Sequence, residues 1–411
     1  MNTSLTRLLP VLAAVILAAC ASTPQHTPRP TPLLLISIDG LRPGDVNAAE
    51  MPNLARFAAT GVQAEGMRPA YPTLTFPNHY TLVTGLRPDR HGIVHNWIVD
   101  HDLGSFHHSK PAAVEQSQWW GGTPIWVSAR RAGLRSATLY WPGSEAEING
   151  LRPDIWMKYD DGTSAAWRAN TVGNWLLLPK SKRPDFATLY FNKVDSLSHR
   201  YGPNSPEASA ARRDTDAALG ALFERLRQHG KLERINIVLV SDHGFAEVPP
   251  QNLIAIESMV DATIASAQSD GQVIGFVPKP GFEQQAAQRL FGRHDHYQCW
   301  DKANLPARWH YGSNPRIPAI ICQMDEGWDA HPQATVDRLK QVPLRGSHGY
   351  DPALPSMRAT FIAHGPAFKP GSRLPLFDNV DVYPLMMELI GVEAAPNDGT
   401  ARTFDAVRKR D

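Results

Sequence analysis

The sequence predicts an α/β protein in which helices cover both faces of a mostly parallel sheet. Apolar segments rich in β-branched and aromatic residues alternate with amphipathic helical segments, which is typical of a doubly wound sheet. Most of these apolar segments end in, or run into, an aspartate, and functional side chains gather beyond the carboxyl ends of parallel strands. The strands are expected at residues 33–39, 136–142, 186–195 and 235–244.

Helices are expected between these strands. The longest helical pattern places Ala211, Ala218 and Leu222 on one apolar face. A last helix is closed by Gly391, a residue type that commonly ends helices. The segment 357–368 returns to strand character. The predicted helices span residues 51–61, 123–133, 205–229 and 379–392.

The region 249–343 has a different character, with short elements, many polar turns and two cysteines. We interpret it as a smaller α+β subdomain inserted into the main domain. The main domain then consists of residues 33–248 and 344–411, and one large domain with an insertion fits a chain of 411 residues.

The first 20 residues resemble a signal peptide, with Arg7 before a short apolar run. The run ends in Leu-Ala-Ala-Cys, typical of a bacterial lipoprotein signal in which Cys20 is lipidated; the alternative is ordinary cleavage near Ala19 or Ala21. Residues 21–32 form a proline-rich tether. We therefore expect an exported, periplasmic lipoprotein anchored in the membrane. In that oxidising compartment Cys299 and Cys322 are expected to pair, the alternative being two free buried thiols.

Composition excludes one class of partner. Hydrophobic residues make up 42% of the chain and charged residues 20%, which is ordinary for a globular protein. The formal net charge is +1. A nucleic-acid polymer is not expected as a partner, because binding its phosphate backbone requires a basic surface. The sequence leaves the oligomeric state open.

Acidic and histidine residues recur where predicted strands end. Oxygen and nitrogen donors without a thiolate suit two metal ions of the zinc type with positions left open for substrate. Any one of these residues could instead be a helix cap or a structural histidine. The prediction of a metal site depends on their occurring together at several strand ends. The candidates are Asp39, Asp195, His199, Asp242, His243 and His348.

The stretch YPTLTFPNHYTLVTG contains a threonine in an unusual setting. Thr75 is expected to cap a helix that has Pro77 in its first turn and ends before Gly85. A helix N-terminus binds phosphate, and metal coordination activates a threonine hydroxyl for nucleophilic attack. The alternative is that Thr75 only caps the helix. His79 is interpreted as structural.

These segments together resemble the bacterial nucleotide pyrophosphatase/phosphodiesterase family of the alkaline phosphatase superfamily. The resemblance covers residues 33 to 391 and is weakest in the insert. It depends on motifs that follow one another in order: SIDGLRP, TFPNHYTLVTGLRPDRHGIVHN, YWPGSEA, DSLSHRYGP, SDHGF and GSHGYDP.

The resemblance implies a role for each matching position. Thr75 resembles the nucleophile that forms a phospho-enzyme, and Asn96 the residue that binds a phosphate oxygen together with the N–H of Phe76. Two Zn²⁺ ions are implied as cofactors. Asp39, Thr75, Asp242 and His243 correspond to the ligands of one, and Asp195, His199 and His348 to those of the other.

No arginine adjoins Thr75, which argues against a phosphomonoesterase. Phe76 and Tyr159 resemble the rings that sandwich a nucleotide base. We therefore expect hydrolysis of nucleotide phosphodiesters, pyrophosphates or dinucleotides to nucleoside 5′-monophosphates. One alternative is a choline-type lipid-headgroup phosphodiesterase, with Trp97, Trp119 and Trp120 near the site. Another is a non-catalytic lipoprotein that binds zinc or phosphate.

Overall fold

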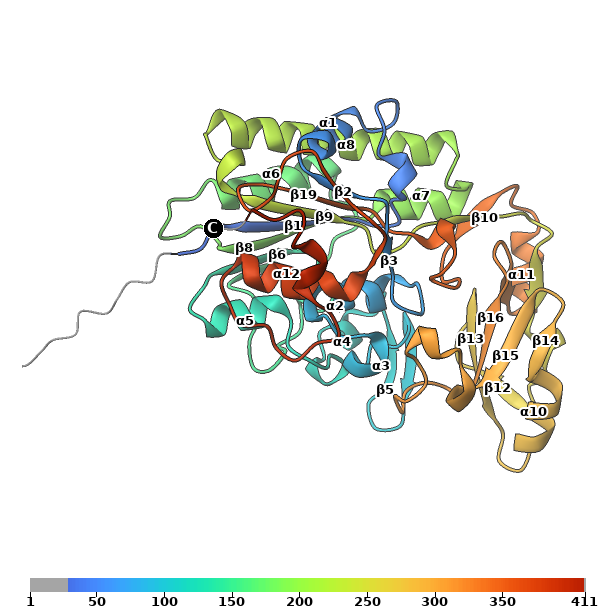
Figure 1. Cartoon of the computed structure of the whole chain (residues 1–411). Helices are drawn as coiled ribbons and strands as arrows, with labels where there is room; N and C mark the ends of the chain where they lie inside the picture. Colours follow the sequence, from blue (N-terminus) through green and yellow to red (C-terminus); the bar gives the residue numbers. More distant parts are fainter. Residues whose placement is uncertain (1–28, 410–411) are drawn as a thin grey trace, which may run out of the picture.

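The computed structural model describes residues 29–409. The predicted signal peptide, Cys20 and most of the predicted tether lie outside the described residues. The main domain is built on an eight-stranded sheet in which only β19 runs antiparallel to its neighbours (Figure 1). In spatial order the strands are β20 (Ser372–Leu374), β2 (Val62–Ala64), β19 (Phe361–His364), β9 (Asn236–Val240), β1 (Leu33–Ile38), β8 (Phe186–Phe191), β6 (Ser136–Leu139) and β7 (Ile155–Met157).

Alternation along the central strand explains why helices cover both faces. Leu33 and Leu35 of β1 join one hydrophobic core, whereas Leu34 and Ile36 join a second core on the opposite face. Neither face of the strand meets water, as expected for a strand in the centre of a parallel sheet. The predicted α/β class is therefore confirmed.

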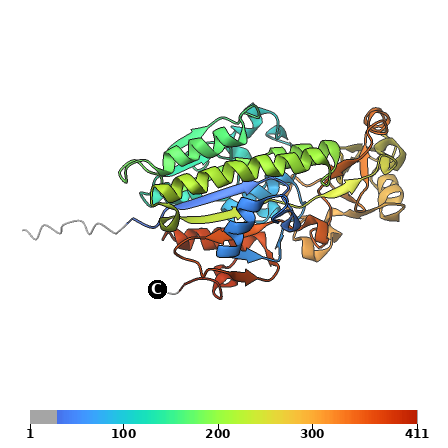
Figure 2. The same cartoon turned by 90° about the horizontal axis from the view of Figure 1, so that it is seen from above.

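One face carries α1, α6, α7 and α8, and the other carries α2, α5 and α12 (Figure 1). Figure 2 shows α8 lying along the sheet. The helices of the first face are α1 (Pro52–Thr60), α6 (Ala165–Leu176), α7 (Lys193–Tyr201) and α8 (Pro206–Gln228). The others of the main domain are α2 (Thr75–Thr84), α3 (Pro88–His91), α4 (Pro111–Val114), α5 (Ile125–Arg131) and α12 (Val382–Leu389).

The ends of these helices follow the sequence in most places. The Ser205 hydroxyl accepts a hydrogen bond from the N–H of Ala208 and so caps α8. The last helix is shorter than predicted, because residues 379–381 form a 3-10 turn before α12 begins. Gly391 follows the end of α12 with a φ of 66°, which suits glycine.

The insert leaves and rejoins the main domain through one two-stranded ribbon, β10 (Ala246–Val248) with β18 (Arg345–Ser347). This ribbon lies directly outside the predicted boundaries at 249 and 343. Within the insert an antiparallel sheet has the order β12 (Ala265–Ala267), β13 (Val273–Pro278), β16 (Ile320–Met324), β15 (Tyr297–Asp301) and β14 (Gly292–His294). Its other elements are β11 (Leu253–Ala255), β17 (Asp329–His331), α9 (Ile256–Met259), α10 (Glu283–Leu290) and α11 (Gln333–Leu339).

A disulfide joins Cys299 and Cys322, as the sequence predicts. The two residues lie directly opposite each other on β15 and β16, so the bridge links neighbouring strands of the insert sheet. Both are buried in a hydrophobic core built mostly from residues of the insert.

The remaining elements are small. Two short strand pairs lie outside the main sheet: β3 (Met67–Arg68) with β21 (Phe377–Asp378), and β4 (Trp97–Asp100) with β5 (Gly104–His107). Between residues 29 and 409 no helix combines the length and apolar character needed to cross a bilayer. Further 3-10 turns are Pro43–Asp45, Ser117–Trp119, Leu232–Arg234, Lys302–Asn304, Ala307–Trp309, Pro355–Met357 and Ala401–Phe404.

Candidate active site

Three neighbouring strands bring the candidate residues together. Asp39 follows β1, and Asp242 and His243 follow β9, which pairs with β1 in parallel. On the other side of β1, β8 ends at Phe191, so the prediction that its strand runs on to residue 195 is wrong. Asp195 lies instead in the first turn of α7, and His199 lies one turn further on.

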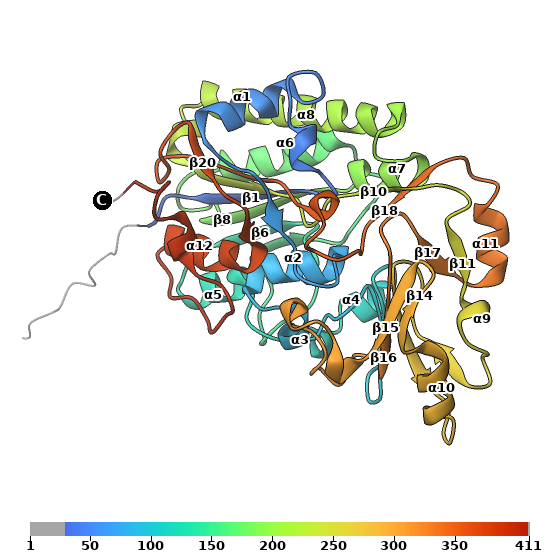
Figure 3. The ribbon, with the colours of Figure 1, turned by 45° about the vertical axis from the view of Figure 1, so that its right-hand side comes forward.

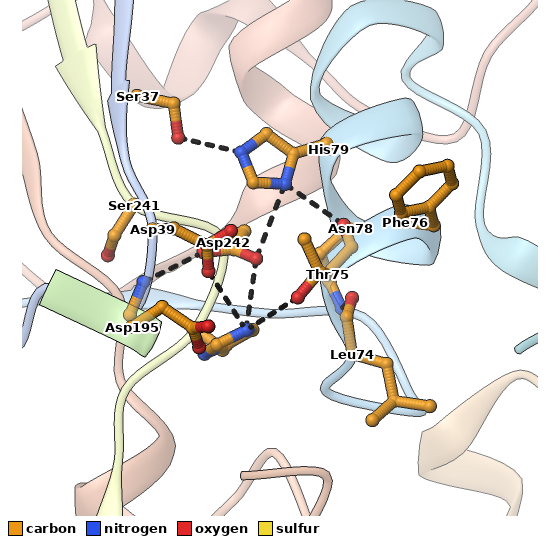
Figure 4. A network of polar contacts seen from close by, with 12 residues as sticks. Ser37, Asp39, Leu74, Thr75, Phe76, Asn78, His79, Asp195, Ser241 and Asp242 are labelled. Atoms are coloured by element: carbon orange, nitrogen blue, oxygen red, sulfur yellow. Dashed lines mark hydrogen bonds and ion pairs between the residues drawn. The ribbon is translucent and has the colours of Figure 1, made fainter. Parts of the chain in front are cut away.

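Two more segments complete the cluster. His348 follows β18, the strand by which the insert returns to the main domain. Thr75 begins α2 on the other face of the sheet. Figure 4 shows Asp39, Asp195 and Asp242 gathered on one side of Thr75.

The first group consists of Asp39, Thr75, Asp242 and His243. His243 Nε2 lies 3.0 Å from Asp242 Oδ2 and 3.5 Å from Asp39 Oδ1. It also lies 3.3 Å from Thr75 Oγ1. Ligands of a tetrahedral zinc ion with bonds of ~2.0 Å lie ~3.3 Å apart, so these spacings fit a shared cation.

The second group consists of Asp195, His199 and His348. Asp195 Oδ1 lies 3.4 Å from His199 Nε2 and 3.6 Å from His348 Nε2. The same ligand spacing applies here. The groups adjoin: ligand atoms of Asp39, Asp195 and His243 all lie within 4.8 Å of one another.

The tautomers of the three histidines support metal binding by these residues. Each Nδ1 lies against a backbone carbonyl, at 3.0 Å for His243, 3.1 Å for His199 and 2.8 Å for His348. A carbonyl can only accept, so each Nδ1–H donates. In a neutral ring Nε2 is then the acceptor and directs its lone pair at a carboxylate, the arrangement that metal-binding histidines adopt.

Each of the three carboxylates has one oxygen without a hydrogen-bond donor. Asp39 Oδ1, Asp195 Oδ1 and Asp242 Oδ2 are buried and have no hydrogen-bond partner. Their other oxygens are used where a donor is at hand: Tyr190 donates to Asp39 Oδ2 at 2.5 Å, and the N–H of Gly40 to Asp242 Oδ1 at 3.1 Å. Partnerless oxygens that face nitrogen lone pairs fit cations between them.

The charges of the cluster reinforce this conclusion. Burial, with the carboxylates of Asp242 and Asp195, raises the pKa of Asp39 well above its ordinary value. Burial, with His243 and His199 nearby, holds the pKa of His348 well below its ordinary value. His348 is therefore neutral and supplies no positive charge to Asp195. Burial lowers the pKa of His199, but the carboxylate of Asp195 outweighs it and raises that pKa, so His199 is the group that would exchange its proton for a bound metal ion.

The expected helix cap at Thr75 is wrong. Leu74 is the N-cap of α2, and Thr75 is the first helical residue. The Thr75 hydroxyl makes no capping bond and instead faces His243. The rest of the helix is as expected, with Pro77 in the first turn and Gly85 in the left-handed conformation at its end.

Asn96 lies beside this helix end. Its Oδ1 accepts the N–H of Phe76 at 3.0 Å, so that N–H is not free in this structure, contrary to the sequence expectation. The amide group of Asn96, with two donors, is left for another partner. Asn96 also lines a cleft with His199 and His348, which places it next to the second group.

The aromatic candidates differ in their surroundings. Tyr159 is 44% exposed, and its ring packs edge-on against Tyr140. Phe76 packs against Phe106, 5.8 Å between ring centroids. Of the tryptophans considered for a choline cage, Trp119 and Trp120 are buried in the core, and only Trp97 is exposed. The described residues therefore do not present those three rings as one cage.

His79 is fully buried, and both of its ring nitrogens are in use. Nε2 lies 2.8 Å from Ser37 Oγ. Nδ1 lies 3.0 Å from the carbonyl of Thr75 and 3.3 Å from Asp242 Oδ2 (Figure 4). His79 is therefore held between Ser37 and the backbone of Thr75, which supports its structural interpretation.

Two supporting residues were missed by sequence reasoning. Tyr190 holds Asp39, and Ser37 holds His79; they lie opposite each other in the register of β8 and β1. In sequence both lie within buried strands, where a tyrosine or a serine carries no functional signal. The register of β8 with β1 brings segments about 150 residues apart into contact. Only this pairing places Tyr190 and Ser37 beside the site.

Comparison with known proteins shows the family of this chain. Residues 33–351 match the family model described as type I phosphodiesterase / nucleotide pyrophosphatase. The chain belongs to this family, whose members are hydrolases. It is 37% identical over 396 residues to a venom phosphodiesterase, CdcPDE, of Crotalus durissus collilineatus, with 92% of this chain and 46% of that protein covered. The chain thus spans about half the length of the venom enzymes it matches.

Shorter relatives are covered more completely. The bis(5′-adenosyl)-triphosphatase enpp4 of Xenopus laevis is 33% identical, with 92% of this chain and 81% of that protein covered. Murine ectonucleotide pyrophosphatase/phosphodiesterase 5 has a solved structure with a TM-score of 0.86 and 30% identity, covering 92% of this chain and all of that one. A second murine structure is of an inactive threonine-to-alanine variant in complex with AMP.

Proposed function

We propose that this chain is a two-zinc phosphodiesterase that hydrolyses nucleotide phosphodiesters and pyrophosphates to nucleoside 5′-monophosphates. One observation carries the proposal. The hydroxyl of Thr75 lies against His243 in a cluster whose buried carboxylate oxygens lack partners. Nitrogen and oxygen donors without thiolates suit zinc. The first group would hold one ion and the second group the other.

Bound ions would supply positive charge next to Thr75 and to the phosphate, lowering the pKa of the hydroxyl and stabilising the charge that develops. The residues divide the remaining tasks. Thr75 Oγ1 forms a bond to phosphorus as the bond to the leaving oxygen breaks. Water then cleaves the phospho-threonine, which releases the nucleoside 5′-monophosphate and restores the hydroxyl.

Surrounding residues would orient this attack. His79 Nδ1 donates to the carbonyl of Thr75, which fixes the backbone from which the hydroxyl projects. The free amide of Asn96 is proposed to donate to a phosphate oxygen. Phe76 and Tyr159 are proposed to stack on the base of the nucleotide that is retained.

The relatives support a nucleotide as substrate. One is named a bis(5′-adenosyl)-triphosphatase, and the murine structural neighbour was solved with AMP in a threonine-to-alanine variant that is inactive. We propose that Thr75 has the same importance here. The choline-type alternative has no matching support, because two of the three tryptophans it needs are buried.

A panel of substrates tests this function. The chain without residues 1–20 is purified, its bound metal is measured, and hydrolysis of a nucleotide aryl ester, an aryl monophosphate and an aryl phosphocholine is compared. We expect about two zinc ions per chain and the highest kcat/KM for the nucleotide ester. Little bound metal and no turnover would refute the proposal that the chain is an enzyme. A preference for the monophosphate or the phosphocholine would refute the proposal that it is a nucleotide diesterase.

We also propose that the chain is exported in a bacterium and anchored through lipidated Cys20, which lies outside the described residues. The disulfide within the insert is compatible with an oxidising compartment. The mass of the mature protein from a bacterial membrane fraction tests it. We expect a lipidated N-terminal Cys20, and a chain without added lipid that begins near Ala21 would support ordinary cleavage instead.

A further inference from the structure

A basic surface surrounds the amino ends of the central strands. The candidate active site is at the opposite end of the same strands, because Asp39 and Asp242 follow the carboxyl ends of β1 and β9. The basic side chains lie on four segments, residues 180–185, 231–235, 366–371 and 405–409, and we call this surface the basic end. Its exposed cations include Lys180, Lys182, Arg234, Lys369 and Lys409.

Two of these segments flank the start of β1. The N–H of Leu33 donates to the carbonyl of Asp185 at 2.9 Å, which places the segment 180–185 on one side. The N–H of Asn236 donates to the carbonyl of Pro32 at 2.9 Å, which places the segment 231–235 on the other side. The cations of both segments therefore belong to one face of the molecule.

The other two segments continue this face beyond β9. The N–H of Ala367 donates to Asn236 Oδ1 at 3.1 Å, and the N–H of Lys409 donates to the carbonyl of Ala367 at 2.9 Å. Lys369 Nζ donates to the carbonyl of Ala406 at 2.8 Å. The four segments thus form one continuous surface.

The positive charge of the basic end is largely uncompensated. Within residues 29–409 none of its five exposed cations forms an ion pair; the pairs found at this end join Arg29 to Asp185 and Arg408 to Glu388. The exposed carboxylates on the four segments are Glu233 and Asp405. Because the formal net charge of the whole chain is only +1, the rest of the molecule is net acidic. The near-zero total conceals an uneven distribution of charge.

The arrangement of these cations fits an extended anionic partner. They come from four segments and stand on exposed positions, so a small anion cannot meet them all. An anionic lipid bilayer can, and each lysine or arginine near its surface adds to the attraction.

The start of the described chain favours a bilayer as this partner. Residue 29 lies at the basic end, where Arg29 Nη1 is 3.4 Å from Asp185 Oδ2. Figures 1 and 3 show the start of β1 and the C-terminus at one end of the molecule and the insert at the other. The proposed lipidated Cys20 precedes residue 29 by a stretch that spans at most ~30 Å when extended. An anchor at Cys20 would therefore hold the basic end close to the bilayer.

We propose that the basic end docks on an anionic lipid bilayer and orients the enzyme with its active site facing away from the membrane. The inference goes beyond the proposed catalytic function and rests on the proposed anchor only for the choice of partner. β1 runs from Leu33 to Ile38, so Asp39 lies ~20 Å from the basic end at ~3.3 Å per residue. The charge of the bilayer is screened within ~8 Å at physiological salt, so it does not repel a nucleotide at the active site.

Vesicle binding tests the surface without the lipid anchor. The chain without residues 1–20 is sedimented with vesicles of phosphatidylcholine alone or of equimolar phosphatidylcholine and phosphatidylglycerol. We expect binding to the anionic vesicles only, and this binding should weaken steeply as salt rises. Equal binding to both kinds of vesicle, or binding to neither, would overturn the proposal.

Two double variants locate the binding surface. Lys180→Gln with Lys182→Gln should lower the partition coefficient onto anionic vesicles about 25-fold, at about fivefold for each cation. Lys279→Gln with Lys340→Gln is the matched control, because both lysines are exposed and lie on the insert. The control should bind like the native protein, and both variants should keep the native kcat/KM for a nucleotide aryl ester in solution. Equal losses of binding in the two variants would show that net charge alone matters and would overturn the docking surface.

Acetylation of lysines reports the orientation. With anionic vesicles present, Lys180, Lys182 and Lys409 should be acetylated several-fold more slowly than in free solution, whereas Lys279 and Lys340 should react at an unchanged rate. Mass spectrometry of peptides measures both sets. Uniform protection, or protection of the insert lysines, would contradict the orientation.

A DNA duplex is the competing anionic partner. A duplex presents its charge along a line, whereas a bilayer meets all four segments, so a duplex at equal phosphate concentration should not displace the chain from anionic vesicles. Displacement would assign the basic end to nucleic acid and overturn the membrane proposal. The levels of failure are distinguishable: turnover of nucleotide esters without vesicle binding refutes only the docking, whereas vesicle binding without turnover refutes only the proposed function.

Discussion

The two proposed metal groups are built from the same kinds of ligand but sit in different surroundings. In the first group the side chains of Asp39, Asp242 and His243 are at most 2% exposed. In the second group the side chain of His199 is 42% exposed and that of Asp195 17%. The first group stands on the ends of central strands, and the second on helix α7 and on the ribbon that returns from the insert. One site is therefore rigid and enclosed, and the other faces the cleft.

The largest effect is expected at the enclosed group. Thr75→Ala removes the nucleophile and should lower kcat by more than about a thousandfold, while metal content and melting temperature stay near native. Thr75→Ser keeps a hydroxyl and should retain far more activity. Turnover of a nucleotide aryl ester, with metal analysis, checks both. Near-native rates in Thr75→Ala would remove Thr75 from the chemistry.

Metal removal tests the difference between the groups directly. Because the second group is more open, a chelator should take its ion first, and activity should fall with the first of about two equivalents lost. His199→Ala should retain about one ion per chain. Metal content and activity are measured at each step of one chelator titration, which shows whether activity is lost with the first ion. Loss of both ions in a single step from the native protein would contradict the comparison.

The first group contains a ligand that is held by another side chain. Asp39 accepts a hydrogen bond from the side chain of Tyr190, whereas the histidines of both groups donate to backbone carbonyls that no substitution removes. Tyr190→Phe should therefore lower activity about tenfold, in kcat rather than KM. Steady-state kinetics check this split. Phe191→Leu in the same strand is a control for packing, and an equal loss there would assign the effect to the strand.

The smallest effect concerns the stability of the insert. Burial alone would lower the pKa of His331, but its bonds to Asp270 and Asp329 raise it to about 9 from 6.5. A raised pKa stabilises the fold fully below pH ~6.5, and this contribution is lost as pH rises through ~9. We expect the free energy of unfolding to fall by ~1–3 kcal/mol over that range.

Denaturant titrations at several pH values measure this loss. His331→Gln carries no charge that changes in this range, so the variant should be less stable near pH 6 and show a flatter pH dependence. If the free energy of unfolding of His331→Gln fell with pH as steeply as that of the native protein, the pH dependence would belong to another group.

The sheet and most of the site could be predicted because their signals are local. Apolar strands, the residues that follow Ile38 and Val240, and the glycine-closed helix after Thr75 can all be recognised within a few neighbouring positions. Thr75 was misplaced by one residue because a cap and a first helical residue look alike in sequence. Asp195 was assigned to a strand because strand β8 and helix α7 follow each other within two residues.

What could not be predicted depends on contacts between distant segments. Tyr190 meets Asp39 only through the register of β8 with β1. The walls of the cleft meet through long-range contacts such as the one from Arg316 of the insert to Asp100 at the end of β4. Strands of three to six residues in the insert carry too little periodicity to fix their pairing in advance.

The ribbon of β10 and β18 has an evolutionary consequence. Because the insert is attached only at this point of the chain, its loops can lengthen, shorten or be exchanged while the central strands keep their positions. Yet β18 runs directly into His348, so any replacement must return its last strand in the same register. Exchange of the insert in the laboratory should therefore keep both strands of the ribbon and join the new segment between Val248 and Arg345.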